Sequence, residues 1–196
     1  EIMSSDWSSD VCSSDLEICW KGLKAGDQVQ LDKKKLIEAF PSYHSRHEIT
    51  LGYRLIEKRN RLKECYRGLA QEQLLKLIKK LGKDYLTEEY SQALLCYSGD
   101  SMPLSKEIIN NTEVLLHDAT FIDGKDRNEN THASLSEVFE LVHDANISLL
   151  GLFHLSARYR HNTIVSKIKD KIKKFQINFP VFYIFNFIKA INFKKI

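Results

Sequence analysis

The stretch ALLCYSGDSMPLSKEIINNTEVLLHDATF, residues 93–121, contains two apolar runs that each end in polar residues. The first run leads into Gly99-Asp100 and the second into His117-Asp118, with a short helical pattern after Pro103 between them. A third run, ISLLGLF at 147–153, ends at His154. Apolar runs of strand length that alternate with helices indicate buried strands in a sheet covered by helices. The sequence therefore predicts an α/β fold and leaves open whether neighbouring strands run parallel.

The segments around this stretch extend the pattern. Residues 23–44 read as two short strands joined by a charged turn, and 49–58 as another strand. An amphipathic helix is predicted over 69–83, with Gly82 as its stop signal. A second helix follows Ser134, whose position three residues before Glu137 is typical of a capping box. A basic helix over 164–175 and an aromatic strand over 179–187 complete the prediction.

The first sixteen residues form a different kind of sequence. Ser-Ser-Asp occurs three times there, and DWSSDVCSSDL, residues 6–16, resembles a translated sequencing adapter. The alternative interpretation is a disordered polar tail. Residues 1–19 are therefore expected to be artefactual or disordered, and they are excluded from the fold prediction.

Composition narrows the class of protein. The hydrophobic content of 43% and charged content of 28% are typical of a globular protein in aqueous solution. No apolar run reaches the roughly 20 residues of a membrane helix, so no membrane partner is expected. Four scattered cysteines without a C-x-x-C pair favour reduced thiols and a cytoplasmic location. The net charge of +3 suits a polyanionic partner without requiring one.

The three apolar runs end in residues that bind metals or transfer protons, namely Asp100, His117 with Asp118, and His154. Sites in such sheets lie beyond the strand ends, where loops converge. A single histidine after an apolar run is usually a hydrogen-bonded structural residue. Three such ends in succession favour a site, although spacing alone leaves both interpretations open.

The ordered motifs YSGDS (97–101), HDATF (117–121), THAS (131–134) and HLSARY (154–159) resemble the C-terminal half of the ribonuclease Z family, in the metallo-β-lactamase superfamily. FPSYH at 40–44 with LGYR at 51–54 resembles the family's strand that ends in a metal-ligand histidine. The resemblance covers about residues 20–159. It implies that 20–185 are the C-terminal portion of an αββα sandwich, with 186–196 as a tail.

The resemblance also implies roles for individual residues. Two Zn²⁺ ions would bind at one edge of the sandwich, with Asp100 as the bridging carboxylate and His154 and His44 as imidazole ligands. His47 is the alternative to His44. His132 matches the histidine that protonates the leaving oxygen, and Asp118 would orient it. Arg158 would contact a phosphate oxygen, whereas His117 is expected to be structural.

Two departures from the family pattern matter. The superfamily motif H-x-H-x-D-H occurs nowhere in the chain, so we expect a truncated gene product that is inactive by itself and exposes apolar surface where its missing half would pack. The family's long arm with a Gly-Pro-rich tip is also not recognisable. The interval 58–95 contains no proline and reads as one charged helix and a connector, so the arm is predicted to be absent or of another type.

Three functions therefore remain open for the intact parent. The first is a zinc-dependent endoribonuclease of the ribonuclease Z type, which processes the 3′ end of a tRNA precursor and acts as a homodimer. The second is a related metal-dependent hydrolase acting on another phosphodiester or ester. The third is a non-catalytic half-domain or interaction module.

Overall fold

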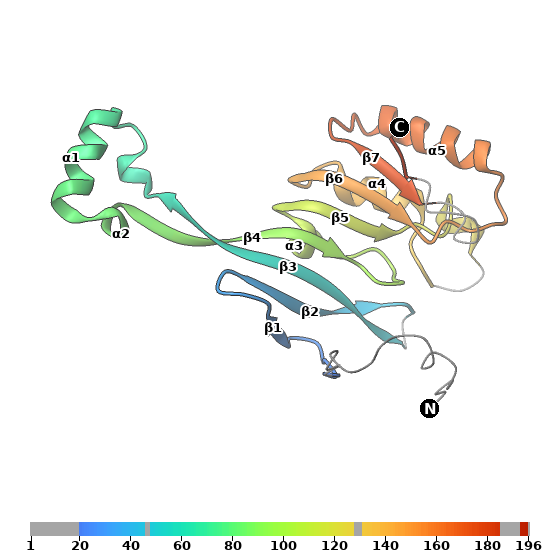
Figure 1. Ribbon diagram of the computed structural model, residues 1–196. Coiled ribbons are helices and arrows are strands. Elements are labelled where there is room, and N and C mark those ends of the chain that lie inside the picture. Colours follow the sequence, from blue (N-terminus) through green and yellow to red (C-terminus); the bar gives the residue numbers. More distant parts are fainter. Residues whose placement is uncertain (1–19, 46–47, 128–130, 185–192, 196) are drawn as a thin grey trace, which may run out of the picture.

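The computed structural model describes residues 20–45, 48–127 and 131–184, together with the backbone of 193–195. Within these ranges the strands form one eight-stranded sheet whose order follows the sequence, from β1 to β8 (Figure 1). The strands are β1 (Gln28–Gln30), β2 (Lys35–Tyr43), β3 (Ile49–Leu62), β4 (Thr87–Tyr97), β5 (Thr112–Asp118), β6 (Ile147–Phe153), β7 (Val181–Ile184) and β8 (Phe193–Lys195).

The sheet is mixed, which resolves the question of strand direction. Strands β1 to β4 pair antiparallel, β4 to β7 pair parallel, and β8 returns antiparallel to β7. Each parallel step needs a crossover, and these contain α3 (Lys106–Ile109), α4 (Leu135–Val142) and α5 (His161–Lys174). Because β2, β4, β5 and β6 all run in one direction, their carboxyl ends lie at the same edge of the sheet.

The hydrophobic core lies between the parallel strands and the helices α4 and α5. Leu115, Leu150 and Leu152 of the sheet form one buried cluster with Phe139 of α4 and Ile168 of α5. The start of α4 is fixed by the predicted capping box, since the Glu137 amide donates to the Ser134 side chain. The predicted α/β class is confirmed, as one helix-covered sheet of the kind that makes up half of an αββα sandwich.

The opposite face of the antiparallel strands is apolar and partly open. A hollow of about 560 Å³ is lined mainly by apolar side chains, including Val29, Ile37 and Leu95. Trp20 and Leu31, which also line it, are 90% and 53% exposed. This face therefore exposes large apolar side chains to solvent.

The interval 58–95 differs from the sequence prediction of one helix and a connector. Strands β3 and β4 continue past the end of β2 and pair with each other through residues 58–62 and 87–91. Beyond this ribbon come the 3-10 helix η1 (Glu64–Tyr66), α1 (Gln71–Leu81) and α2 (Lys83–Leu86). Residues 58–92, called the arm below, project from the body of the sheet (Figure 1). The structure thus shows a projecting arm that contains no Gly-Pro pair, in line with the second of the two predicted alternatives.

Sequence analysis did not predict the ribbon, because its strands carry charged residues and not the alternating apolar residues of a buried strand. Across the two strands Arg61 bonds to Glu88 at 2.8 Å and Lys58 approaches Glu89 at 3.4 Å. Only the helix α1 was recognisable, by its apolar periodicity and by Gly82, whose amide closes it onto the Ile78 carbonyl. None of the helices in the described ranges combines the length and apolar character that a membrane crossing requires.

Candidate metal centre

The carboxyl ends of the parallel-running strands bring five predicted residues together. Asp118 is the last residue of β5, His44 and His154 directly follow β2 and β6, and Asp100 follows β4 by three residues. His132 arrives from the loop before α4, which a bridge between Phe121 and Ser134 holds against the end of β5. The strand-end cluster is defined as these five side chains: His44, Asp100, Asp118, His132 and His154.

A continuous chain of contacts runs through one side of the cluster. His132 Nδ1 lies 2.6 Å from Asp118 Oδ2, and His132 Nε2 lies 2.9 Å from His44 Nε2. His44 Nδ1 lies 2.8 Å from Glu48 Oε2, so a carboxylate stands at each end of a pair of imidazoles. The two rings meet edge to face, at an interplanar angle of 89°.

The two facing Nε2 atoms indicate what this side of the cluster can bind. When both carboxylates are ionised, each accepts a hydrogen from the Nδ1 of its histidine. The lone pairs of the two Nε2 atoms then face and repel each other. A proton or a metal cation between them removes this repulsion. Tetrahedral zinc, with Zn–N bonds of about 2.0–2.1 Å, holds two ligand nitrogens about 3.3 Å apart. The observed 2.9 Å is therefore close to a metal-binding separation.

His154 is oriented by Thr120. The Thr120 hydroxyl lies 2.7 Å from both Asp118 Oδ1 and His154 Nδ1. Because the carboxylate can only accept, the hydroxyl donates to Asp118 and accepts from His154 Nδ1. His154 Nε2 then keeps its lone pair, and it lies 3.6 Å from Asp100 Oδ2. An imidazole fixed in this way by its second nitrogen is typical of metal ligands.

Asp118 is fully buried, and its charge is held by hydrogen bonds. Its Oδ1 accepts from the amide and hydroxyl of Thr120, and its Oδ2 accepts from the Ser101 amide and faces His132. Burial raises the pKa of nearby Tyr97, and the negative charges of Asp100 and Asp118 raise it further. The cluster combines two carboxylates with three imidazoles, which is the donor set of a divalent metal.

The backbone at the cluster adopts left-handed conformations at three positions. Gly99 has φ 64°, and His132 and His154 have φ 55° and 60°. A non-glycine residue in this region costs about 1–2 kcal/mol, and such strain gathers at functional sites. At Gly99 a Cβ would lie 2.8 Å from the Leu51 carbonyl oxygen, so the turn before Asp100 requires glycine.

Three residues of the cluster have the spacing of a metal site, and they differ from the expected ligands. Asp118, His132 and His154 each offer a ligand atom within 4.8 Å of the other two. The resemblance implied His44, Asp100 and His154 instead, with Asp118 and His132 in catalysis. Both sets share His154 and belong to one cluster, so the residues present fit a metal ion.

The other predicted residues lie around the cluster. Arg158 makes no hydrogen bond to it; its guanidinium donates to the Asp126 carbonyl and lies 5.0 Å from the Phe121 ring centre. His117 is structural as expected, because its Nδ1 donates to the Asp118 carbonyl and its Nε2 accepts from the Leu104 amide. Burial lowers the pKa of His117. His47, the alternative to His44, lies outside the described residues.

Sequence analysis missed Thr120 and Glu48. Thr120 stands two residues after Asp118 in HDATF, and a hydroxyl at that spacing after a strand-end carboxylate is a recognisable signal. Glu48 stands four residues after His44, and nothing in the neighbouring sequence marks it.

Sequence comparison with known proteins finds three relatives of the same name in different organisms. Ribonuclease Z of Thermococcus gammatolerans is 28% identical over 159 residues, which are 71% of this chain and 51% of that protein. Ribonuclease Z of Sulfurisphaera tokodaii is 30% identical over 145 residues, 65% of this chain and 48% of that protein. The chain is similar to ribonuclease Z. A shorter match, 37% over 79 residues, is to ribonuclease Z of Staphylococcus haemolyticus and covers 38% of this chain and 26% of that protein.

The chain spans about half the length of the ribonuclease Z relatives that it matches over more than 140 residues. No family model matches it. Among solved structures, a metal-dependent hydrolase from Parabacteroides distasonis aligns with a TM-score of 0.45 and 17% identity, over 82% of this chain and 56% of that one. That score is too low to support an argument about the site.

Proposed function

We propose that the chain carries one part of the active site of a zinc-dependent phosphodiesterase of the ribonuclease Z type. The observation that carries the proposal is the convergence of the strand-end cluster, whose members come from segments as distant as His44 and His154. The similarity to ribonuclease Z supports the same reading. The chain lacks H-x-H-x-D-H and spans about half the length of those relatives, so the activity is proposed for the whole protein.

In this proposal Asp100, His154 and His44 hold the metal, and the contacts of Thr120 and Glu48 present the Nε2 atoms of the two histidines to it. Bound zinc would activate a water molecule and neutralise charge on the phosphate. Two zinc ions and a homodimer stay predictions of the resemblance, and a cytoplasmic location stays a prediction from the cysteine pattern.

His132 is assigned the donation of a proton from Nε2 to the leaving oxygen. Its Nδ1 contact with Asp118 fixes the orientation of the ring and leaves Nε2 to face the reacting group. The side chain of Asp118 reaches the His132 imidazole at 2.6 Å. Arg158 is assigned a phosphate contact, which requires its guanidinium to leave the Asp126 carbonyl.

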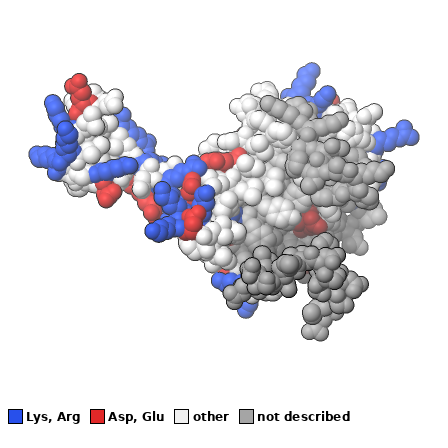
Figure 2. All heavy atoms as spheres, viewed as in Figure 1, with Lys and Arg blue, Asp and Glu red and all other residues white. Residues whose placement is uncertain are grey.

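The charge of the arm supports an RNA substrate. It contains nine basic and five acidic residues, and its lysines and arginines are prominent on the surface (Figure 2). A basic projection of this kind suits the phosphate backbone of a tRNA precursor. The tip of the arm lacks the Gly-Pro pair. This difference favours the second candidate function, a related hydrolase that acts on another phosphodiester.

Cleavage of a defined precursor tests the proposal. The chain is joined to the part of the Thermococcus gammatolerans relative that precedes the matched region, and the fusion is incubated with Zn²⁺ and a tRNA precursor bearing a 3′ trailer. We expect one cut, 3′ of the discriminator base, and a loss of at least 100-fold in rate for His154→Ala. The matched control His143→Ala, an exposed histidine outside the cluster, should cleave normally.

Three results would count against the proposal. Cleavage of bis(p-nitrophenyl) phosphate without cleavage of the precursor would favour the second candidate. Undiminished cleavage by His154→Ala would remove the cluster from the reaction. A fusion that folds and binds zinc but cleaves neither substrate would favour a non-catalytic module.

A further inference from the structure

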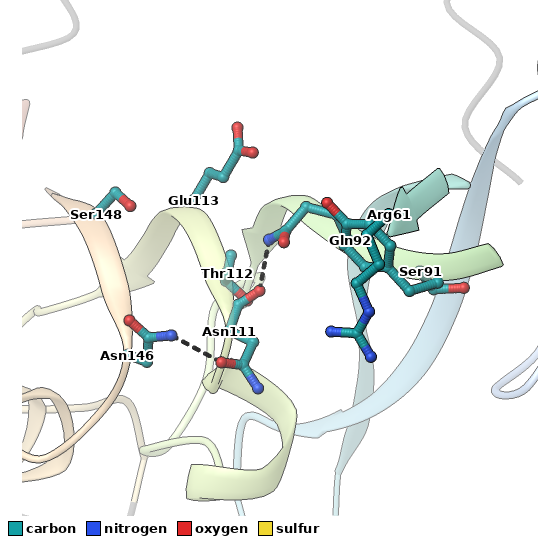
Figure 3. Close-up of a pocket in the computed structure, with 9 residues that line it drawn as sticks. Arg61, Ser91, Gln92, Asn111, Thr112, Glu113, Asn146 and Ser148 are labelled. Carbon is teal, nitrogen blue, oxygen red and sulfur yellow. Dashed lines mark hydrogen bonds between the residues drawn. The ribbon is translucent and has the colours of Figure 1, made fainter. Parts of the chain in front are cut away.

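A second polar site lies at the corner where the arm leaves the body of the sheet. A cavity of about 530 Å³, called the corner pocket below, is bounded by Arg61 and Gln92 on the arm strands and by Asn111 and Asn146 at the starts of β5 and β6 (Figure 3). Along β5 it begins at Thr112, six residues before Asp118. At roughly 3.3 Å a residue, the pocket lies about 20 Å from the strand-end cluster.

The amide side chains of the pocket are held in place by one another. Gln92 Nε2 donates to the Asn111 carbonyl at 2.8 Å, and Asn146 Nδ2 donates to Asn111 Oδ1 at 2.8 Å. The second polar atom of each amide, namely Gln92 Oε1, Asn111 Nδ2 and Asn146 Oδ1, has no hydrogen-bond partner among the described residues. The pocket thus offers two acceptors and a donor that are already oriented.

Thr112 adds a second unsatisfied polar group at the wall of the pocket, and a ligand would reach its covered hydroxyl oxygen after a small shift of the wall. It lines the pocket, is 2% exposed, and its hydroxyl has no hydrogen-bond partner within the described part of the chain. Leaving a buried hydroxyl unpaired costs about 1–3 kcal/mol, so such groups are usually satisfied in the working state of a protein.

The charges at the pocket indicate an uncharged ligand. Arg61 Nε bonds to Glu88 at 2.8 Å, and Glu113, on the opposite wall, accepts from Arg59 at 2.8 Å. Each charge at the wall is therefore already balanced by a neighbour. The Arg61 guanidinium lies 5.1 Å from the ring centre of Tyr90. One side of the pocket is therefore formed by a planar cation next to an aromatic ring.

We propose that the corner pocket binds the nucleobase of a ribonucleoside. Amide side chains match the adjacent donors and acceptors on the edge of a base, and the planar guanidinium of Arg61 can stack on its face. A sugar would use the amides and the hydroxyl but would gain little from the stack. The proposal stands apart from the metal chemistry, because binding at this pocket needs neither zinc nor cleavage.

Titration of the full metal-free chain with neutral ribonucleosides tests the proposal. Adenosine, guanosine, cytidine and uridine are added separately, and the side-chain amide signals of Gln92, Asn111 and Asn146 are followed by NMR. At least one nucleoside should give saturable shifts. Thr112→Val keeps the side-chain shape and removes the unpaired hydroxyl, and Asn111→Gly keeps the left-handed backbone (φ 57°) and removes the amide.

Each substitution should weaken binding about fivefold or more, the effect of one lost hydrogen bond. Thr112→Val should fold at least as stably as the parent, and Thr163→Val, on the exposed face of α5, should bind normally. The proposal is overturned if no nucleoside shifts these signals, if ribose alone produces the same shifts, or if both pocket variants bind like the parent. None of these results depends on whether the chain belongs to a nuclease.

Discussion

Replacing Thr120 by valine tests the orientation of the strand-end cluster. The substitution keeps the shape of the side chain and removes the hydroxyl that lies 2.7 Å from both Asp118 Oδ1 and His154 Nδ1. The bond to the buried carboxylate is worth about 1.5–3 kcal/mol and the bond to the imidazole about 0.5–1.5 kcal/mol. Because His154 is 41% exposed, water replaces much of the second bond. The hydrogen bond from the Thr120 backbone amide to Asp118 Oδ1 remains in the variant.

We therefore expect Thr120→Val to lower the free energy of unfolding by about 2 kcal/mol, measured by urea denaturation of the metal-free chain. Zinc affinity, measured by titration calorimetry, should fall about 10- to 100-fold, because His154 Nε2 is no longer held as the unprotonated nitrogen. Thr120→Ser, which restores the hydroxyl, is the matched control and should recover most of both losses. The reasoning fails if valine changes neither quantity, or if serine behaves like valine.

Three further predictions concern single residues. Gly99→Ala should destabilise the chain by at least about 1–2 kcal/mol in urea denaturation, because its φ is 64° and its Cβ would meet the Leu51 carbonyl; unchanged stability would contradict the turn geometry. Ser134→Ala should cost about 1 kcal/mol by removing the cap of α4, whereas Ser134→Asp should cost little; equal losses would contradict the cap. Burial raises the pKa of Cys96 to about 12, so its thiol stays protonated from pH 7 to 9 and iodoacetamide should label exposed Cys65 but not Cys96 until the chain unfolds. Equal labelling of Cys65 and Cys96 in the folded chain, measured by mass spectrometry, would contradict the burial of Cys96.

The sequence predicted the parts of the fold that are encoded locally. Ser134 and Glu137 marked the start of α4, and Gly82 marked the end of α1. The strand ends at Asp100, Asp118 and His154 were recognisable because each polar residue follows an apolar run. Strand direction was not encoded in this way, since a buried run has the same pattern in a parallel and an antiparallel pair.

The arm shows why the remainder was missed. Its strands pair outside the core, so Lys58, Arg61 and Glu88 occupy positions where a buried strand would carry apolar residues. At the cluster, the residue types and their order along the chain identified the members. The contacts among them depend on side-chain orientation and on the left-handed backbone at His132 and His154, which no periodicity reveals.

The central claim is that the strand-end cluster binds a divalent metal, and the histidine ring signals of the full chain test it most directly. Zn²⁺ is added to ¹⁵N-labelled, metal-free protein in steps below one equivalent. We predict that the ring nitrogens of His154 and His44 shift first, while those of His143 and His161 do not move. Shifts confined to His143 or His161, or no histidine shift below one equivalent, would contradict the claim.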